Sequence, residues 1–549
     1  MDSKSVPEDV PQPALHVEVA EAEEDGGDHT LKQTASAVIA GDTAFAAFTR
    51  VEAIRYFWWP VLLSMVATLA CMNDGFQNQL PGSLISNQGF INQFGTEMLD
   101  DGGKALSASW VSTWGAMMPV GQVPGSLFAG WINDKVGRRG GMYAMTVAYI
   151  VGTILEMTAK EPGQWAGAKF MFGLGQGLTA TTMPVYVSEI APPQLRGTLL
   201  CMYGFFFAIG QLVASVILYV IQNTRPLDWR LAVYTEWSFH GLWIVFGLLW
   251  LPESPWHYAR KKNDEAALKS LNRIYKYVGD FDPYRELRVM KNELNVQAHH
   301  AMSPDASSSI MDLFRGTDRL RTFGSALAVS TQMLSGCIVI FTYTTYFVQQ
   351  AGIGEPFLAS MIVTIVLLVG LVVSFFAVEF LGRRTLLIGG GIGCTICNLV
   401  IGITGCFPKT PALNHAALAF VFLFVFSYAV SFAGVCWAMV SEVSSSRLKS
   451  KSAAFATLTY DLVLLAFTVS VPYMLASTGP GARDWGTKSL FCFAITAGLA
   501  TLGNYFLCPE TKGRTQGEMD EIYEKRIPPR KSAKYVTSLE IAGGKTHHD

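Results

Sequence analysis

The sequence predicts an all-α polytopic membrane protein in which twelve transmembrane helices form two six-helix bundles. Its 549 residues are 50% hydrophobic and only 15% charged, which is too apolar for an ordinary soluble protein of this size. Apolar stretches of membrane-spanning length occur as two sets of six, separated by a long polar break. A short turn of acid, glycine and paired arginines occurs twice, within Gly130–Arg139 and Glu379–Arg384, at corresponding places of the two sets. The chain is therefore expected to consist of two related halves.

Each segment can be assigned in order along the chain. Residues 1–55 are rich in Pro, Glu, Asp and Ala and are expected to form a disordered cytoplasmic tail without a cleavable signal. The N-terminal bundle should occupy 56–251 and the C-terminal bundle 322–508, joined by a cytoplasmic linker with short helices at 252–321 and followed by a cytoplasmic tail at 509–549. The predicted spans are 57–82, 107–131, 141–158, 164–188, 198–222, 231–251, 322–348, 356–378, 385–406, 414–441, 452–475 and 488–508.

The distribution of cations orients these spans. Connections after the even-numbered spans and the linker carry clustered Lys and Arg, whereas the opposite connections carry only scattered ones. The positive-inside rule then places both termini and the linker in the cytoplasm.

Several classes of protein are disfavoured. A net charge of −2 argues against nucleic-acid binding. The nine cysteines lie mostly in apolar stretches, and Cys394 and Cys397 have no nearby His or acid, so neither a disulfide framework nor a metal site is expected. No cofactor is implied. The soluble segments show no nucleophile–base pair, which argues against an enzyme.

Five motifs, in this order and spacing, resemble the sugar-porter family of the major facilitator superfamily: Gly130–Arg139, Pro184–Gly197, Leu251–Trp256, Glu379–Arg384 and Pro509–Gly513. Within that family the chain is most similar to fungal α-glucoside (maltose-type) permeases, through Pro252–Trp256, Tyr346–Gly352 and Val440–Leu448. The resemblance implies a central site between two six-helix bundles and transport by alternating access.

The resemblance also implies a network of cytoplasmic ion pairs that closes one conformation and opens in the other. We call its members the gate residues. They are Asp134, Arg138, Arg139, Glu189, Arg196, Glu253, Glu379, Arg383, Arg384, Glu442 and Arg447, with Glu510 in the last motif. Lys169 stands where the family usually has Arg, which keeps the charge and loses the bidentate fork.

Substrate-binding candidates follow from the same alignment. Gln211, Gln332 and Trp437 match family positions that contact sugar, and Gln77 is assigned to the same pocket. The alternative for each glutamine is an interhelical hydrogen bond, and for Trp437 it is packing. Met333 and Ile338 replace residues that are usually Gln and Asn, so a larger glycoside or a non-sugar metabolite is also plausible.

Coupling to protons is open at this stage. Gln77 occupies the first-span position of the acid in proton-coupled members and cannot take up a proton. Asp74 and Asp461 are acids within predicted spans and are the candidates for that role. The alternative is that either acid lies hydrated, or as a cap, at a span end.

Taken together, these residues favour a multi-pass transporter of the fungal plasma membrane for a sugar or related polyol, an α-glucoside above all. Its partners would be a small-molecule substrate, protons if transport is coupled, and the lipid bilayer. Transport of a fungal secondary metabolite on the same scaffold is the first alternative. A non-transporting nutrient receptor is the second.

Overall fold

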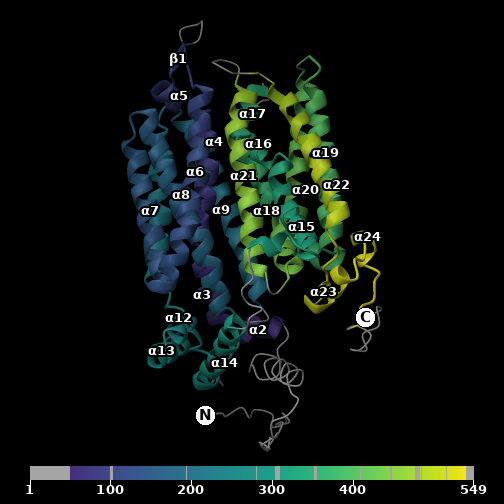
Figure 1. Ribbon diagram of the computed structural model, residues 1–549. Coiled ribbons are helices and arrows are strands. Elements are labelled where there is room, and N and C mark those ends of the chain that lie inside the picture. The colour runs from purple at the N-terminus through teal and green to yellow at the C-terminus, as the bar shows by residue number, and fades with distance from the viewer. Residues whose placement is uncertain are drawn as a thin grey trace, which may run out of the picture. The chain divides into compact units, whose positions relative to one another are not determined.

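Helices account for nearly all of the regular structure in the computed structural model (Figure 1). The structure describes residues 50–98, 103–192, 195–279, 281–302, 310–351, 355–408, 410–445, 448–476, 483, 485–514 and 516–538. The predicted disorder of the N-terminal tail falls almost entirely outside these residues, as does Arg447.

In the N-terminal half, the first predicted span forms two consecutive helices, α3 and α4, and the next four form one long helix each. The bounds are α2 Arg50–Tyr56, α3 Trp58–Thr68, α4 Ala70–Leu84, α5 Gln88–Phe94, α6 Ala108–Lys135, α7 Arg138–Thr158, α8 Pro162–Ile190 and α9 Arg196–Thr224. The only strands among the described residues, β1 (Glu97–Met98) and β2 (Lys104–Ala105), pair antiparallel between α5 and α6.

The sixth predicted span is broken into three pieces. They are α10 Arg230–Tyr234, α11 Glu236–Leu242 and a π-helical turn, η1, over Trp243–Leu248. The Trp243 indole nitrogen donates a 2.9 Å hydrogen bond to Thr146 Oγ1 on α7, which anchors the turn. Single π-helical turns often mark functional segments of a helix.

The linker folds into short helices, and the C-terminal half repeats the long-helix pattern. The linker bounds are α12 Pro255–Arg260, α13 Asp264–Ile274, α14 Pro283–Met302 and η3 Ile310–Phe314. The C-terminal bounds are α15 Asp318–Leu334, α16 Cys337–Phe341, α17 Thr344–Ala351, α18 Pro356–Leu381, α19 Arg383–Thr404, α20 Pro411–Val443, α21 Lys449–Leu475, η4 Gly486–Ser489, α22 Leu490–Leu507, α23 Gln516–Glu524 and α24 Pro529–Ser532. The last two helices return to the C-terminal half, where the Glu510 amide donates to Ser532 Oγ.

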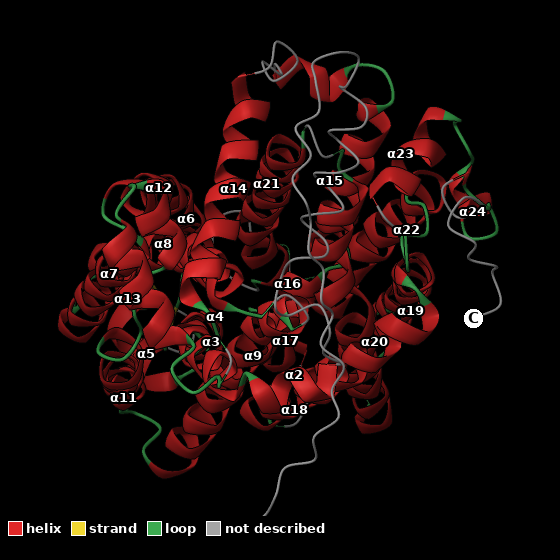
Figure 2. Cartoon of the chain, turned by 90° about the horizontal axis from the view of Figure 1, so that it is seen from below, coloured by secondary structure: helices red, strands yellow, loops and turns green. Residues whose placement is uncertain are grey.

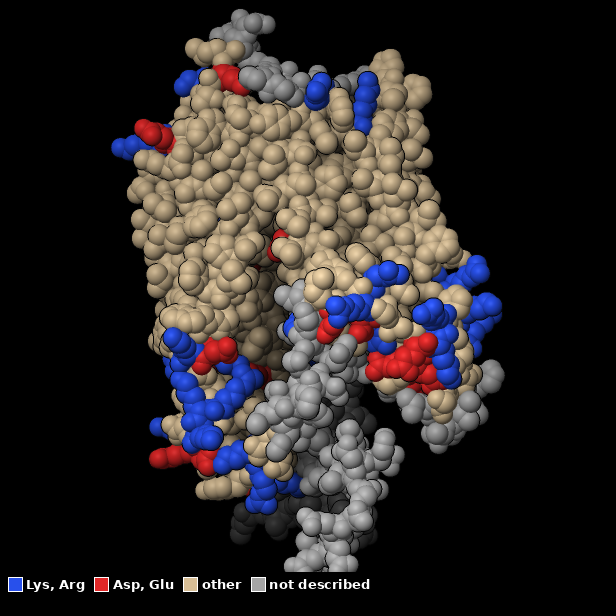
Figure 3. Space-filling model, in the orientation of Figure 1, with Lys and Arg blue, Asp and Glu red and all other residues tan. Residues whose placement is uncertain are grey.

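Eight of the described helices are long and apolar enough to cross a membrane by length and composition. The predicted first, second, fourth and sixth spans are helical but are not long and apolar enough to be counted among these eight. The first carries buried polar side chains, namely Asn73, Asp74, Gln77 and Gln79, and the sixth is broken. On the face seen in Figure 3, charged side chains gather at the two ends and leave a broad band between them almost free of charge. The predicted all-α membrane fold is confirmed, whereas the orientation of the termini stays a prediction.

The two halves contact each other along α6 with α21 and α9 with α18 (Figure 2). Gln79 donates to Ser360 Oγ at 2.8 Å, and Ser83 and Thr345 share a 2.9 Å hydrogen bond. Ser112 donates to the Val469 carbonyl at 2.8 Å. These bonds lie at the end of the helices opposite to the charged turns.

Candidate functional site

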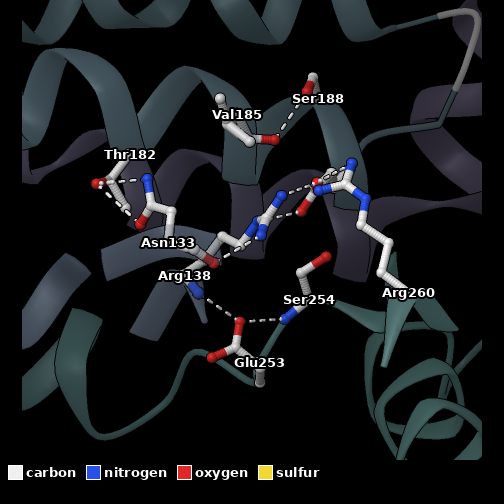
Figure 4. A network of polar contacts seen from close by, with 9 residues as sticks. Asn133, Arg138, Thr182, Val185, Ser188, Glu253, Ser254 and Arg260 are labelled. Atoms are coloured by element: carbon white, nitrogen blue, oxygen red, sulfur yellow. Dashed lines mark hydrogen bonds and ion pairs between the residues drawn. The ribbon is translucent and has the colours of Figure 1, made fainter. Parts of the chain in front are cut away.

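The Arg138 side chain is held between α8 and the end of α6 (Figure 4). Its guanidinium donates to both carboxylate oxygens of Glu189, at 2.9 Å from Nε and 2.6 Å from Nη2. Nη1 donates to the Asn133 carbonyl at 2.9 Å, and Arg260 from the linker lies 3.5 Å from Glu189. Because Arg138 and Glu189 are almost fully buried, this bidentate pair is a strong and geometrically specific contact.

Glu253 caps the first turn of α7. Its two carboxylate oxygens accept from the backbone amides of Arg138 and Arg139 at 2.9 and 3.0 Å, and Ser254 donates to it at 2.8 Å. A negative side chain is favourable at the N-terminus of a helix, where amides lack partners within the helix. Gly137, with φ of +108°, precedes the turn, and any β-carbon there would collide with the Glu253 carboxylate.

The C-terminal half repeats this cap with different residues. Glu510 accepts from the amides of Arg383 and Arg384 at the start of α19, at 2.9 and 3.2 Å. Gly382 has φ of +85°, and a β-carbon there would collide with Glu510. The two charged turns of the sequence thus form matching structures.

The side-chain pair is looser in the C-terminal half. Arg383 Nη2 reaches Glu442 at 3.4 Å, and Glu442 also accepts from the Thr511 hydroxyl. Arg384 donates instead to the Tyr505 carbonyl, at 2.9 Å, and to the Cys508 carbonyl. None of the described ion pairs of Arg138, Glu189, Arg383 and Glu442 joins the two halves, although Glu189 also pairs with Arg260 of the linker.

Four further gate residues lie elsewhere or outside the description. Asp134 is exposed and forms no ion pair or hydrogen bond among the described residues. Arg139 donates from Nη2 to Tyr143 and to the Leu248 carbonyl. Arg196 is exposed at the start of α9, near Tyr275 and Glu286 of the linker. The side chain of Glu379 is not among those described.

No hydrogen bond among the described residues joins any two of the four predicted substrate-binding residues. Gln211 is buried on α9 and donates to Asn78 Oδ1 at 3.3 Å, while its Oε1 has no hydrogen-bond partner in the described part of the chain. Gln332 is buried on α15, donates to the Phe432 carbonyl at 3.1 Å and accepts from Tyr428. Trp437 is 41% exposed on α20 and packs edge-on against Tyr460.

Gln77 lies in a buried group of charged side chains. Its Nε2 donates to Glu236 at 2.6 Å, and its Oε1 accepts from Lys169 at 3.0 Å. Lys169 also forms an ion pair with Glu156. We call Gln77, Glu156, Lys169 and Glu236 the buried charge cluster.

The two predicted proton carriers have unlike surroundings. Asp74 is buried on α4 and accepts from the hydroxyls of Tyr149 and Tyr203. Asp461 is partly exposed on α21, and no hydrogen bond or ion pair involves its side chain among the described residues.

Sequence reasoning missed two acids of the buried charge cluster. Glu156 and Glu236 lie inside predicted spans, and an acid within a span is by itself a sign of function. His240, which shares a 2.8 Å hydrogen bond with Thr153, also lies inside a predicted span and was also missed. For all three residues, the signal that could have found them was an ionisable side chain within an apolar span.

Comparisons with known proteins agree with this arrangement. The family model described as "Sugar (and other) transporter" matches residues 63–523. The chain is 27% identical over 506 residues to the major facilitator-type transporter ecdD of Aspergillus rugulosus, covering 89% of this chain and 92% of that one. It is also 27% identical to the probable glucose transporter rco-3 of Neurospora crassa, covering 82% of this chain and 77% of that one.

Solved structures show the same fold. The inward-open conformation of the xylose transporter XylE from E. coli superposes with a TM-score of 0.67 at 20% identity, covering 83% of this chain and 98% of that one. Its partially occluded inward-open conformation gives a TM-score of 0.66. The chain therefore belongs to the sugar transporter family of the major facilitator superfamily.

Proposed function

We propose that this protein carries a sugar or related polyol across the membrane by alternating access. The observation that carries the proposal is Gln211, a buried amide on α9, the helix that packs against α18 of the other half. Its Oε1 has no hydrogen-bond partner among the residues that the structure describes. A sugar hydroxyl can donate to such an oxygen, and leaving it unpaired is costly. Tyr460 on α21 lies near Tyr203 of the N-terminal half and Tyr428 of the C-terminal half. Aromatic rings, which pack against the apolar face of a sugar, are therefore present where the halves meet.

The positions of the contacts support alternating access. Hydrogen bonds between the halves gather at one end, through Gln79, Ser83 and Ser112. At the other end, no described ion pair of Arg138 or Arg383 joins the two halves, and Figure 3 shows the surface hollowed between the two charged groups. This is the pattern of a protein closed at one end and open at the other. The opposite conformation would form if the hydrogen bonds between the halves broke and the ion pairs of the charged turns joined the halves instead.

We take an α-glucoside as the substrate, on the resemblance of Pro252–Trp256 and Val440–Leu448 to permeases for such sugars. Relatives named as glucose and hexose transporters support the broader sugar class. Protons are proposed as the driving ion, and the plasma membrane as the location.

The test is uptake of labelled maltose, glucose, glycerol and quinate into yeast that lack their own transporters. Maltose uptake above the empty-vector rate, inhibited by unlabelled maltose, is expected. Glucose uptake alone would retain the sugar class and reject the α-glucoside. Uptake of quinate without any sugar would overturn the proposal in favour of another metabolite. Gln211→Ala should raise the apparent KM about 5- to 100-fold, the loss expected for an unpaired polar partner.

A further inference from the structure

Two acids and one cation are enclosed together in the N-terminal half. Glu156 on α7, Lys169 on α8 and Glu236 on α11 are each 0% exposed. If both acids were ionised, this fully buried site would hold an excess negative charge. A buried charge without a partner is strongly unfavourable, and a group in that position is neutralised instead.

The contacts show how the charges are arranged. Lys169 pairs with Glu156 and donates to Gln77, while Glu236 accepts from Gln77 at 2.6 Å and from the Thr153 hydroxyl at 2.8 Å. Neither carboxylate oxygen of Glu156 has a hydrogen-bond partner among the described residues, so its recorded partner is the ion pair with Lys169. One lysine balances one carboxylate, and the other carboxyl is then favoured in its protonated, neutral form.

From this geometry we propose that Glu156 and Glu236 form a shared proton-binding site, which takes up and releases one proton in each transport cycle. The proposal rests on the transport function proposed above and names the groups that couple it to protons. The only bond that forms or breaks is a carboxyl O–H. Such a pair titrates as a unit, so the proton belongs to neither acid alone.

Among the described residues, Lys169 is the one Lys or Arg that forms an ion pair or hydrogen bond within the buried charge cluster. Lys169 Nζ lies 4.7 Å from the centroid of the Trp165 ring and 5.4 Å from that of Phe172, so aromatic rings border the lysine. His240 shares a hydrogen bond with Thr153 and stacks on Tyr149 at 6.4 Å between centroids.

A third buried acid, Asp74, lies next to the same group of contacts. Tyr149 donates to Asp74, which also accepts from Tyr203. Asp74 is therefore the rival proton site, and the experiment must separate it from the pair.

The proton site is joined to the proposed sugar site through consecutive residues of α4. Gln77 bridges Lys169 and Glu236, and the next residue, Asn78, accepts from Gln211. A shift of α4 when sugar binds Gln211 would therefore alter the contacts that balance the carboxyl pair. Differential contact with the two states is the requirement for coupling.

Transport in proteoliposomes tests the site. Under an inward proton gradient, the wild type should accumulate substrate, whereas Glu156→Gln and Glu236→Gln should lose accumulation and retain exchange of labelled for unlabelled substrate. In either variant the remaining carboxylate balances Lys169 without a proton. Glu161→Gln, the same change at an exposed residue next to α8, is the matched control and should accumulate like the wild type.

Three results would overturn the proposal. They are accumulation retained in both glutamine variants, a wild type that equilibrates its substrate without accumulating it, or accumulation lost in Asp74→Asn alone. The last result would assign the proton to Asp74.

Infrared spectroscopy of the purified protein gives a readout that needs no sugar. The wild type should show the C=O stretching band of a protonated carboxyl that weakens as pH is raised, and Glu156→Gln or Glu236→Gln should remove it. A spectrum in which neither variant removes such a band would overturn the proposal. If the wild type keeps the band and carries no sugar, the substrate assignment fails and the proton site stands.

Discussion

Glu510 caps the first turn of α19 in the same way that Glu253 caps the first turn of α7. Each carboxylate accepts from the amides of two consecutive arginines, after a glycine with positive φ. The second glutamate is held more extensively, because Glu510 also accepts from the amides of Thr511 and Lys512 at 3.0 and 3.1 Å. The two halves thus share the backbone of the charged turn, although their side-chain pairs differ in length.

We predict that Glu510→Gln destabilises the protein by about 1–3 kcal/mol, because the amides at the start of α19 lose a charged acceptor. Thermal unfolding of the purified protein measures the effect. Glu524→Gln, at the exposed end of α23, is the control and should unfold like the wild type. Equal melting temperatures for the two variants would contradict a capping role.

At the other turn, Arg138→Lys should cost about 1–3 kcal/mol, since lysine cannot reproduce the two-pronged contact with Glu189. Asp134→Asn should change stability by less than about 0.5 kcal/mol, because the side chain is exposed and unpaired among the described residues. Its uptake rate should still fall if Asp134 pairs in the opposite conformation. Unchanged uptake at equal surface expression would exclude Asp134 from the gate.

The linker should respond to pH through Glu286 on α14. Burial raises the pKa of this carboxyl from 4.5 to about 7, with Glu293 raising it further and the cations of Arg285 and Arg196 opposing the shift. Between these values the folded protein holds a proton that the unfolded chain has released. The stabilisation is therefore complete below pH 4.5 and is lost as pH rises through 7.

We expect that loss to be on the order of 1–2 kcal/mol, since Glu286 is partly exposed to solvent. Protease cleavage of the linker should accordingly be slower at acidic than at neutral pH. Glu286→Gln should make cleavage independent of pH in this range, whereas Glu265→Gln on α13 should leave the pH dependence intact. A pH dependence that persists in Glu286→Gln would assign it to another group.

Much of the fold could be predicted because a membrane span depends on length and hydropathy, which are local properties of the sequence. The prediction was least complete at the sixth span, where the π-helical turn at Trp243 depends on a contact with Thr146 of another helix. The charged turns were located by their repetition, but the caps by Glu253 and Glu510 join residues more than a hundred positions from their partners.

The candidate site was predicted in parts. Gln77 and Lys169 were identified by alignment, but nothing local to either residue shows that Lys169 meets Glu156 or that Gln77 meets Glu236. Those contacts depend on which helices pack together, α7 with α8 and α4 with α11. The positions of the two acids within spans were visible in the sequence, whereas their contacts with Lys169 and Gln77 required the fold.

Gly82 on α4 permits a close approach of the two halves at the end away from the charged turns. A β-carbon at this residue would overlap the backbone carbonyl oxygen of Thr342, which lies between α16 and α17, so Gly82→Ala must push the halves apart. We predict a cost of about 1–3 kcal/mol to the conformation described here, as for overpacking of a core, and slower uptake. Thermal unfolding and initial uptake rates measure the two effects.

Gly167→Ala on α8 is the control, because no other atom lies within 4 Å of its β-carbon, and it should match or slightly exceed the wild type in stability. If Gly82→Ala transports and unfolds as Gly167→Ala does, close contact between the halves at this point is not required for the transport cycle.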